Sequence, residues 1–261
     1  MGTMYVLKAE ILKFWYDLKR YKFNYLIGLL ATFIFLTGIY RGVTSSSEES
    51  GNATTFIGLI LWIFAARCIS DASDNLFEER YYGTIEQISV TRFSLPNIFM
   101  ARFFVDLLFA VIRIFFIGLP MFILFSPKIG IFFTTLENSI ITTIVIISII
   151  ITLYGFGLLL AALGFMFLRI GSFSSVFQYL ILFFSGIVIP YESMPQPLRA
   201  FSNLLPMGLG IRVLSGIEKN MLLFKEILLT ILYSILIFTV AVITFKKSVR
   251  HVKQTGKYSA Y

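Results

Sequence analysis

Charged side chains inside long apolar segments are the residues of this sequence most able to do chemistry. Arg67 and Asp71 lie four residues apart in one such segment, and Arg102 and Asp106 lie four apart in the next. Residues at this spacing share a helix face, so each arginine can neutralise its aspartate. A lone charge at the centre of a bilayer costs at least ~2.5–3.5 kcal/mol, so such groups must be paired or face water. The pattern predicts ion pairs that either line a wet entrance or gate, or simply anchor the helices.

Arg113 lies deeper in the second of these segments, and no acidic residue is four positions away from it. It is therefore the best single candidate for a functional charge, although Asp71 or Asp74 on a neighbouring helix could equally neutralise it. Carboxylates within a membrane also suit an ion-driven secondary transporter or an intramembrane enzyme. Asp71, Asp74 and Asp106 leave these alternatives open, but they are spread along the chain and have arginines nearby.

A polar segment between the second and third apolar segments has the signals of a short helix. Gly83 allows a backbone turn at the end of the preceding helix. Thr84 followed by Gln87 has the spacing of a capping box, which predicts a helix starting at Ile85. The alternative is an ordinary loop between two helices that happens to be capped.

A second informative segment precedes the last apolar stretch and is rich in proline. Pro190 is expected to break the fifth helix, because proline cannot continue a helix without losing a hydrogen bond. Apolar residues at helical spacing lie between the later prolines: Leu198, Phe201 and Leu205. This pattern predicts a short external hairpin that dips back toward the bilayer, and it disfavours a plain polar loop.

Composition places these segments in a membrane. Hydrophobic residues make up 57% of the 261 residues, charged residues only 14%, and the mean hydropathy is +0.85. Soluble domains carry about 25% charged residues. The single cysteine, Cys68, excludes a disulfide framework and a zinc–thiolate cluster, and the single histidine, His251, disfavours histidine-based metal chemistry or a Ser-His-Asp triad. No metal site is expected.

The expected architecture is an all-α polytopic membrane protein with one transmembrane domain over residues 1–261. About 20 apolar residues cross a bilayer as a helix. Six spans are predicted, at about 23–40, 54–73, 98–125, 139–168, 173–189 and 221–245. Lysine and arginine concentrate on the side that holds both ends of the chain, which predicts cytoplasmic termini in a prokaryotic plasma membrane. The net charge of +8 is attributed to these cytoplasmic lysines and arginines, and nucleic acid is not an expected partner.

Residues 4–22 predict an amphipathic helix that lies along the membrane surface. Apolar and aromatic residues recur in it at helical spacing, and charged residues fill the remaining faces. The apolar stripe consists of Leu7, Ile11, Phe14, Trp15, Leu18 and Tyr21.

The two polar segments together resemble the ABC type-2 exporter permeases. Members of this family have a cytoplasmic glutamate and a Gly-Thr-x-Glu-Gln element between the second and third spans; here these are Glu79 and Gly83-Thr84-Ile85-Glu86-Gln87. They also have a Gly-x-x-x-Pro element followed by further prolines and an arginine; here these are Gly186, Pro190, Pro195, Pro206 and Arg212. The resemblance covers nearly the whole chain, but Met194-Pro195-Gln196-Pro197 departs from it in being unusually dense in proline.

The resemblance implies that this chain works together with other subunits. The chain would pair with a second permease subunit, identical or not, and with two separate ABC ATPase subunits, all in contact with membrane lipid. The short helix would dock on the ATPase, with Glu86 and Gln87 exposed for that contact. ATP and Mg would belong to the partner, because the only Gly-Lys pair, Gly256-Lys257, lacks the rest of a Walker A loop. The implied cargo is amphipathic or hydrophobic: a drug, peptide, lipid or lipid-linked glycan.

Overall fold

The computed structural model describes residues 2–46, 52–81, 83, 87, 95–166, 170–221 and 223–255. Within these residues every regular element is a helix, which confirms the all-α fold class. The long helices are α1 (Gly2–Arg20), α2 (Lys22–Ser46), α3 (Asn52–Tyr81), α5 (Leu95–Phe125), α6 (Leu136–Met166) and α10 (Phe224–Thr255). The shorter elements are η1 (Ile129–Phe133), α7 (Gly171–Phe184), η2 (Tyr191–Ser193), α8 (Gln196–Leu204) and α9 (Gly208–Glu218).

Five of the described helices, α2, α3, α5, α6 and α10, are long and apolar enough to cross a membrane. The pair α8 and α9 passes the same test together, but its two helices are bent by 107°. Counting that pair as one span gives six, but it would replace the predicted span at 173–189, and the exact number stays a prediction. The observed helices extend beyond most of the predicted spans, because backbone hydrogen bonds continue where the side chains become polar.

The helix predicted at 173–189 differs from the expectation. It is present as α7, but it has 14 residues and ends at Phe184. At 1.5 Å per residue it covers about 21 Å, less than the ~30 Å hydrocarbon core of a bilayer. The prediction that Pro190 ends this helix is wrong, because the chain leaves the helix at Gly186, whose φ is +87°.

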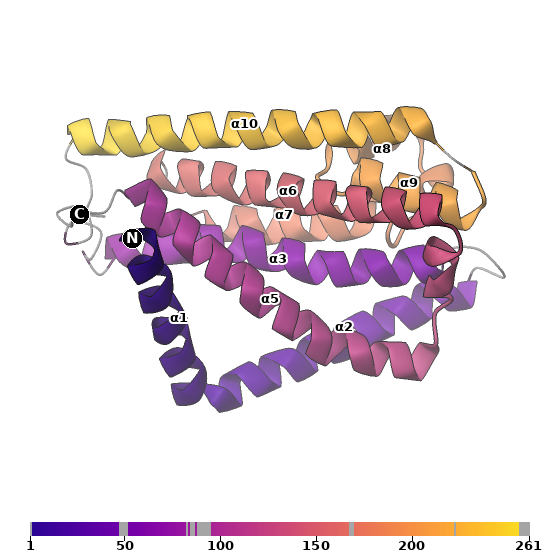
Figure 1. Ribbon diagram of the computed structural model, residues 1–261, viewed down its shortest axis with the longest axis horizontal. Helices are drawn as coiled ribbons and strands as arrows, with labels where there is room; N and C mark the ends of the chain where they lie inside the picture. Colours follow the sequence, from indigo (N-terminus) through magenta and orange to yellow (C-terminus); the bar gives the residue numbers. More distant parts are fainter. Residues whose placement is uncertain are drawn as a thin grey trace.

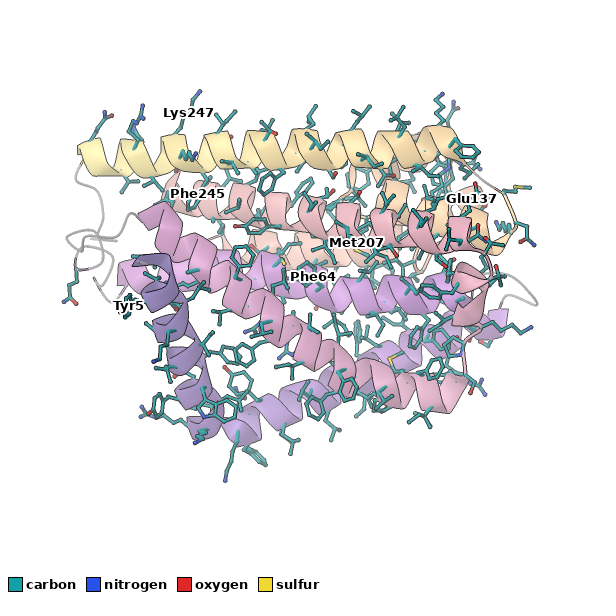
Figure 2. The ribbon with its side chains drawn as sticks, viewed as in Figure 1. Tyr5, Phe64, Glu137, Met207, Phe245 and Lys247 are labelled. Atoms are coloured by element: carbon teal, nitrogen blue, oxygen red, sulfur yellow. The ribbon has the colours of Figure 1, made fainter. Side chains whose placement is uncertain are left out.

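The bundle has a buried centre and a lipid-accessible periphery. In their apolar windows, 67% of the residues of α3 and 61% of those of α6 are buried, against 11% in α2 and 17% in both α5 and α10. Phe64 on α3 and Met207 before α9 both lie inside the bundle (Figure 2). The exposed apolar side chains of α2, α5 and α10 are the expected surface toward lipid.

Figure 1 shows α10 running alongside α6 over most of its length. Their close approach needs a small residue at the contact, because a Cβ on Gly155 would lie 3.3 Å from the backbone of Ile237 and Phe238. Farther along, Phe165 and Phe245 meet edge to face with ring centroids 5.9 Å apart. The last span is therefore attached to the core mainly through α6.

The helix predicted at 4–22 is observed as α1, which crosses the direction of the long helices at one end of the bundle (Figure 1). Phe14 on α1 stacks on Phe109 on α5, with ring centroids 3.6 Å apart. Trp15 and Tyr16 point away from the protein and are exposed. The two sides of the predicted apolar stripe thus have different surroundings: one packs on α5 and the other faces outward.

Different helices form the two ends of the bundle. The C-terminal ends of α3 and α10 lie at the same end as α1, whereas α8, α9 and the start of α10 lie at the other end (Figure 1). We call the first the charged end and the second the hairpin end. The two segments singled out from the sequence therefore belong to opposite ends of the bundle.

Candidate functional site at the two ends of the bundle

The hairpin end begins with the exit of the chain from α7. The backbone N–H of Ser185 donates to the carbonyl of Ile181 at 3.1 Å, and Gly186 follows in the left-handed region. A glycine in this conformation is the usual residue just beyond a helix end, because it has no Cβ to clash. Gly186 thus turns the chain from α7 into the segment that carries Pro190.

A sharp corner joins α8 to α9 and needs a second glycine. A Cβ added to Gly208 would lie 1.8 Å from the carbonyl oxygen of Ser202, which is backbone and cannot move aside easily. Two backbone hydrogen bonds close the corner, from Leu205 to Ser202 and from Gly208 to Leu205. Pro206 is buried within this corner. The corner is therefore a fixed, closely packed junction.

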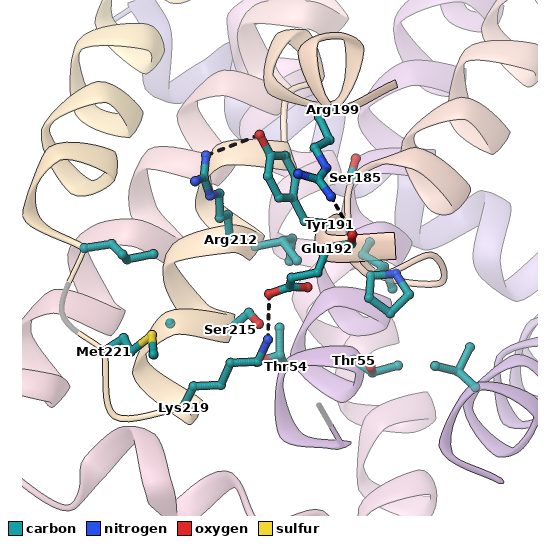
Figure 3. A pocket seen from close by; sticks show the side chains of 18 residues that line it. Thr54, Thr55, Ser185, Tyr191, Glu192, Arg199, Arg212, Ser215, Lys219 and Met221 are labelled. Carbon is teal, nitrogen blue, oxygen red and sulfur yellow. Dashed lines mark hydrogen bonds and ion pairs between the residues drawn. The ribbon is translucent and has the colours of Figure 1, made fainter. Parts of the chain in front are cut away.

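Tyr191 lies at the centre of the hairpin end. The guanidinium carbon of Arg212 lies 4.4 Å from the centroid of the tyrosine ring, and that of Arg199 lies 5.7 Å from it. Arg212 also donates from Nη1 to the tyrosine hydroxyl at 3.3 Å, as Figure 3 shows. Each such cation–π contact contributes ~0.5–2 kcal/mol, depending on its exposure to water. Arg212, predicted from the sequence, is thus the partner of an aromatic residue that the sequence did not single out.

Two further basic side chains, Arg199 and Lys219, hold the short helix η2 in place. Arg199 donates to the backbone carbonyls of Glu192 at 2.6 Å and Met194 at 2.8 Å. The ammonium of Lys219, after α9, meets the Glu192 carboxylate at 2.6 Å. This hydrogen bond holds the pKa of Glu192 below its usual value. The contacts join the proline-rich segment to both hairpin helices.

Glu218 on α9 caps the N-terminus of α3. Its carboxylate accepts hydrogen bonds from the backbone N–H groups of Ala53 at 3.1 Å and Thr54 at 3.0 Å, and from the Thr54 hydroxyl. A carboxylate in this position satisfies free N–H groups and complements the helix dipole. Sequence analysis missed Glu218. The available signal was that the first turn of α3 has no acidic residue of its own.

These contacts surround a cavity of about 390 Å³ that opens at the hairpin end (Figure 3). Its polar side includes Thr54, Ser185, Ser215 and Arg212, and its apolar side includes Ile211. Of the predicted hairpin residues, Gly186, Pro190 and Arg212 line this cavity. Pro195 lies directly before α8, and Pro206 lies in the corner described above.

The charged end contains a polar cavity of about 510 Å³ between α1, α2, α3 and α5. Arg102 donates from Nε to the Glu10 carboxylate at 2.9 Å, and the two side chains are only 11% and 15% exposed. Asp106 lies in the same cavity, where its closest charges include Arg67 and Arg102. The ion pair of Arg102 is thus made with a glutamate of α1, and its predicted pairing with Asp106 within its own helix stays a prediction.

Arg67 on α3 and Arg113 on α5 lie close to each other. Both line a small cavity of about 140 Å³, together with Trp62 and Ser70 of α3. The side chains of Asp71 and Asp74 lie outside the described residues, so their expected role toward Arg113 stays a prediction.

The segment expected to dock on an ATPase is described at two positions. Gly83, two residues after the end of α3, has a φ of +69°, the turn that the sequence predicts there. Gln87 is helical and exposed. Thr84, Ile85, Glu86 and the side chain of Glu79 lie outside the described residues. The docking role of this segment stays a prediction.

No group of three or more histidine, cysteine, aspartate or glutamate residues within the described part of the chain could hold a metal ion. The described residues form a cavity beside a closely packed corner at the hairpin end, and a polar cavity beside an apolar one at the charged end. These features define an all-helical, multi-pass membrane protein.

The chain belongs to the ABC-2 type transporter family, which it matches over residues 2–219. No curated protein sequence matches it. Membership makes the chain a membrane component of an ABC transporter and implies partnership with ABC ATPase components. The matched residues include both ends of the bundle and every described helix except α10.

Proposed function

We propose that the chain is the permease subunit of an ATP-driven exporter. With a second permease subunit it encloses a path for amphipathic or hydrophobic cargo, and two separate ATPase subunits drive it. The observation that carries the proposal is the family match over residues 2–219, on a chain whose two motif segments lie at opposite ends of the bundle. Both termini and the charged end face the cytoplasm of a prokaryotic cell, and the hairpin end faces outward.

The geometry supports coupling through α3. This helix has 30 residues, longer than a bilayer needs, and it reaches from the Glu218 cap to the turn at Gly83. The short helix after Gly83, with Glu79, Thr84, Glu86 and Gln87, is the proposed contact with the ATPase. A force applied there acts directly on a helix that is central to the core.

The hairpin end is the proposed outer closure of the path. The bent pair α8 and α9 does not cross the bundle as one rod, which suits a re-entrant hairpin. ATP binding by the partners would close the charged end and open the hairpin ends of two subunits away from each other. The chain itself would catalyse no reaction in this cycle.

The test is the identity of the proteins that co-purify with the full chain from membranes in mild detergent. We expect an ATPase with a Walker A loop in equal amount, together with a second permease copy or a related chain. Replacing Glu86 and Gln87 by alanine is expected to release the ATPase while the permease keeps its thermal midpoint. A matched control replaces Glu137 and Gln254, two exposed residues outside the proposed contact, by alanine. A chain that purifies alone, and stays alone after crosslinking in membranes, contradicts the proposal.

The two alternatives predict a different energy source. An ion-driven transporter would move its cargo with the proton or sodium gradient, and an intramembrane enzyme would need its carboxylates. We expect transport by the reconstituted complex to require ATP and to survive ionophores. Transport that follows the ion gradient and is abolished in Asp71→Asn, Asp74→Asn and Asp106→Asn would favour the carboxylate-based alternatives.

A further inference from the structure

Three cavities meet at Arg67, near the charged end. The first is the polar cavity of about 510 Å³ described above. The second has about 280 Å³ and is lined mainly by α1, α2 and α5. The third is the small cavity of about 140 Å³ that Arg67 shares with Arg113 and Trp62. Arg67 lines all three and Arg113 lines the last two, so the cavities adjoin one another around these two side chains.

The second cavity combines an apolar wall with basic residues. The basic residues that line it are Lys22, Arg67 and Arg113. Arg67 also faces Asp106 in the adjoining polar cavity. The wall is formed by Leu18, Leu26, Leu29, Phe109, Ile112 and Phe116. We call this cavity the basic groove. An apolar wall edged by cations is complementary to an amphipath whose polar group is an anion.

The basic groove lies where a membrane surface is expected. It is formed at the junction of α1 and α2, and the aromatic residues Trp15, Tyr16 and Tyr21 near this junction are exposed. Tryptophan and tyrosine are enriched at the level of the lipid headgroups. Figure 1 shows α1 turning across the bundle at this place. A lipid headgroup at this level would face the basic residues while its acyl chain follows α2 and α5 toward the bilayer centre.

We propose that the basic groove binds an anionic phospholipid of the surrounding membrane. The phosphate lies against Lys22 and Arg113, and one acyl chain lies along the apolar wall formed by α2 and α5. Basic pockets between membrane helices on the cytoplasmic side favour anionic headgroups, and each basic residue contributes ~1 kcal/mol near such a surface. The proposal rests on the proposed function only for the assignment of this end to the cytoplasmic leaflet.

The two tryptophans of the chain make the proposal measurable. In a Trp15→Phe variant, the only remaining tryptophan is Trp62, which is 7% exposed and lines the third cavity beside Arg113. The variant is placed in nanodiscs that contain phosphatidylglycerol or phosphatidylcholine carrying the same brominated acyl chains. Bromine quenches tryptophan emission at short range, so quenching of Trp62 reports an acyl chain in this region. We expect phosphatidylglycerol to quench Trp62 at a several-fold lower mole fraction than phosphatidylcholine.

Variants of the basic residues separate charge from structure. Arg113→Gln with Lys22→Gln is expected to abolish the preference for phosphatidylglycerol, whereas Arg113→Lys keeps most of it. The matched control is Lys128→Gln, an exposed cation that does not line the basic groove. The thermal midpoint of each variant is measured in parallel, and Arg113→Lys provides the charge-retaining comparison if Arg113→Gln is unstable.

Three outcomes would overturn the proposal. Equal quenching by the two lipids would show that the headgroup charge is not recognised. A preference that survives Arg113→Gln with Lys22→Gln would place the recognition elsewhere. Displacement of the brominated lipid by soluble glycerol phosphate at millimolar concentration would assign the site to a free anion. None of these measurements needs the ATPase, so they can fail while the co-purification experiment succeeds, and the reverse.

Discussion

The two ends of the bundle are built in opposite ways. At the hairpin end, backbone meets backbone at Gly208, and Tyr191 is held between two arginines. At the charged end, α1, α2, α3 and α5 enclose a polar cavity of about 510 Å³ next to an apolar one of about 280 Å³. Both ends carry arginines and carboxylates. Both also hold a cavity, which has about 390 Å³ at the hairpin end. The difference is that close backbone and arginine–tyrosine contacts border the cavity at the hairpin end, whereas two cavities adjoin each other at the charged end.

The difference indicates which end can change shape. Closely packed groups resist displacement because any movement produces overlap, whereas the walls of a cavity can approach each other at low cost. The charged end is also where the proposed ATPase contact lies. A transporter whose hairpin end moves as a rigid unit while its charged end rearranges would be built in this way. The four predictions below test this comparison, from the largest expected effect to the smallest.

Gly208→Ala tests whether the corner at the hairpin end is as tightly packed as the distances indicate. The new Cβ would overlap the Ser202 carbonyl, so α8 and α9 must separate. Overpacking of this kind costs about 3 kcal/mol, at the upper end of the usual range. We expect a large fall in the thermal midpoint of the full chain in detergent.

Gly28→Ala is the matched control, because a Cβ at this helical position has nothing within 4 Å. Alanine is the better helix former of the two residues, so this variant is expected to be neutral or slightly stabilised. Equal thermal midpoints for Gly208→Ala and Gly28→Ala would mean that the corner between α8 and α9 is not tightly packed.

Glu10→Gln tests how firmly α1 is held at the charged end. The change leaves Arg102 without its glutamate from α1, and a charged hydrogen bond of this kind is worth about 2 kcal/mol. We expect faster hydrogen exchange along α1, while the exchange of α8 and α9 stays unchanged. A double-mutant cycle with Arg102→Gln measures the pairwise energy, and the exposed Glu137→Gln serves as the control. Unchanged exchange along α1 would show that its packing on Phe109 alone holds it.

Glu218→Ala tests the link between the hairpin end and α3. Loss of a capping group typically costs ~1 kcal/mol, and here two backbone N–H groups lose their acceptor. We expect faster exchange of the amides of Ala53 and Thr54, with the rest of α3 protected as before. Glu192→Ala, a carboxylate of the same end that does not touch α3, should leave these two amides unaffected.

Acidification tests the weakest contact, the ion pair between Glu192 and Lys219. The pKa of Glu192 is lowered in the folded chain by its hydrogen bond to Lys219. The pair therefore stabilises the fold above the ordinary glutamate pKa of ~4.3, and this contribution is lost as the pH falls through the lowered value. Both side chains are largely exposed, so we expect at most ~1 kcal/mol. The difference in midpoint between the parent chain and Glu192→Gln should shrink as the pH falls below ~4.3 and vanish below the lowered pKa of Glu192. A difference that stays constant throughout acidification would assign it to another cause.

Local signals in the sequence predicted a good part of both ends. The positive φ of Gly83, the hairpin helices after Pro195 and the amphipathic N-terminal helix all follow from residues close together in the chain. The end of α7 was missed, because Pro190 was a stronger signal than Gly186, although the helix had already ended before the proline. Here the glycine turn and the packing of the following segment decided the boundary.

Composition and the length of the apolar segments alone determined that this is an all-helical membrane protein, because a segment of about 20 apolar residues crosses lipid as a helix, which satisfies its own backbone groups. The partners of the charged and aromatic residues were decided only by the tertiary structure. Glu218 meets Thr54 across 164 residues of chain, and Arg102 meets Glu10 across 92. Such contacts depend on how whole helices pack, and no local spacing encodes them. The same is true of the basic groove, whose walls come together only when α1, α2 and α5 do.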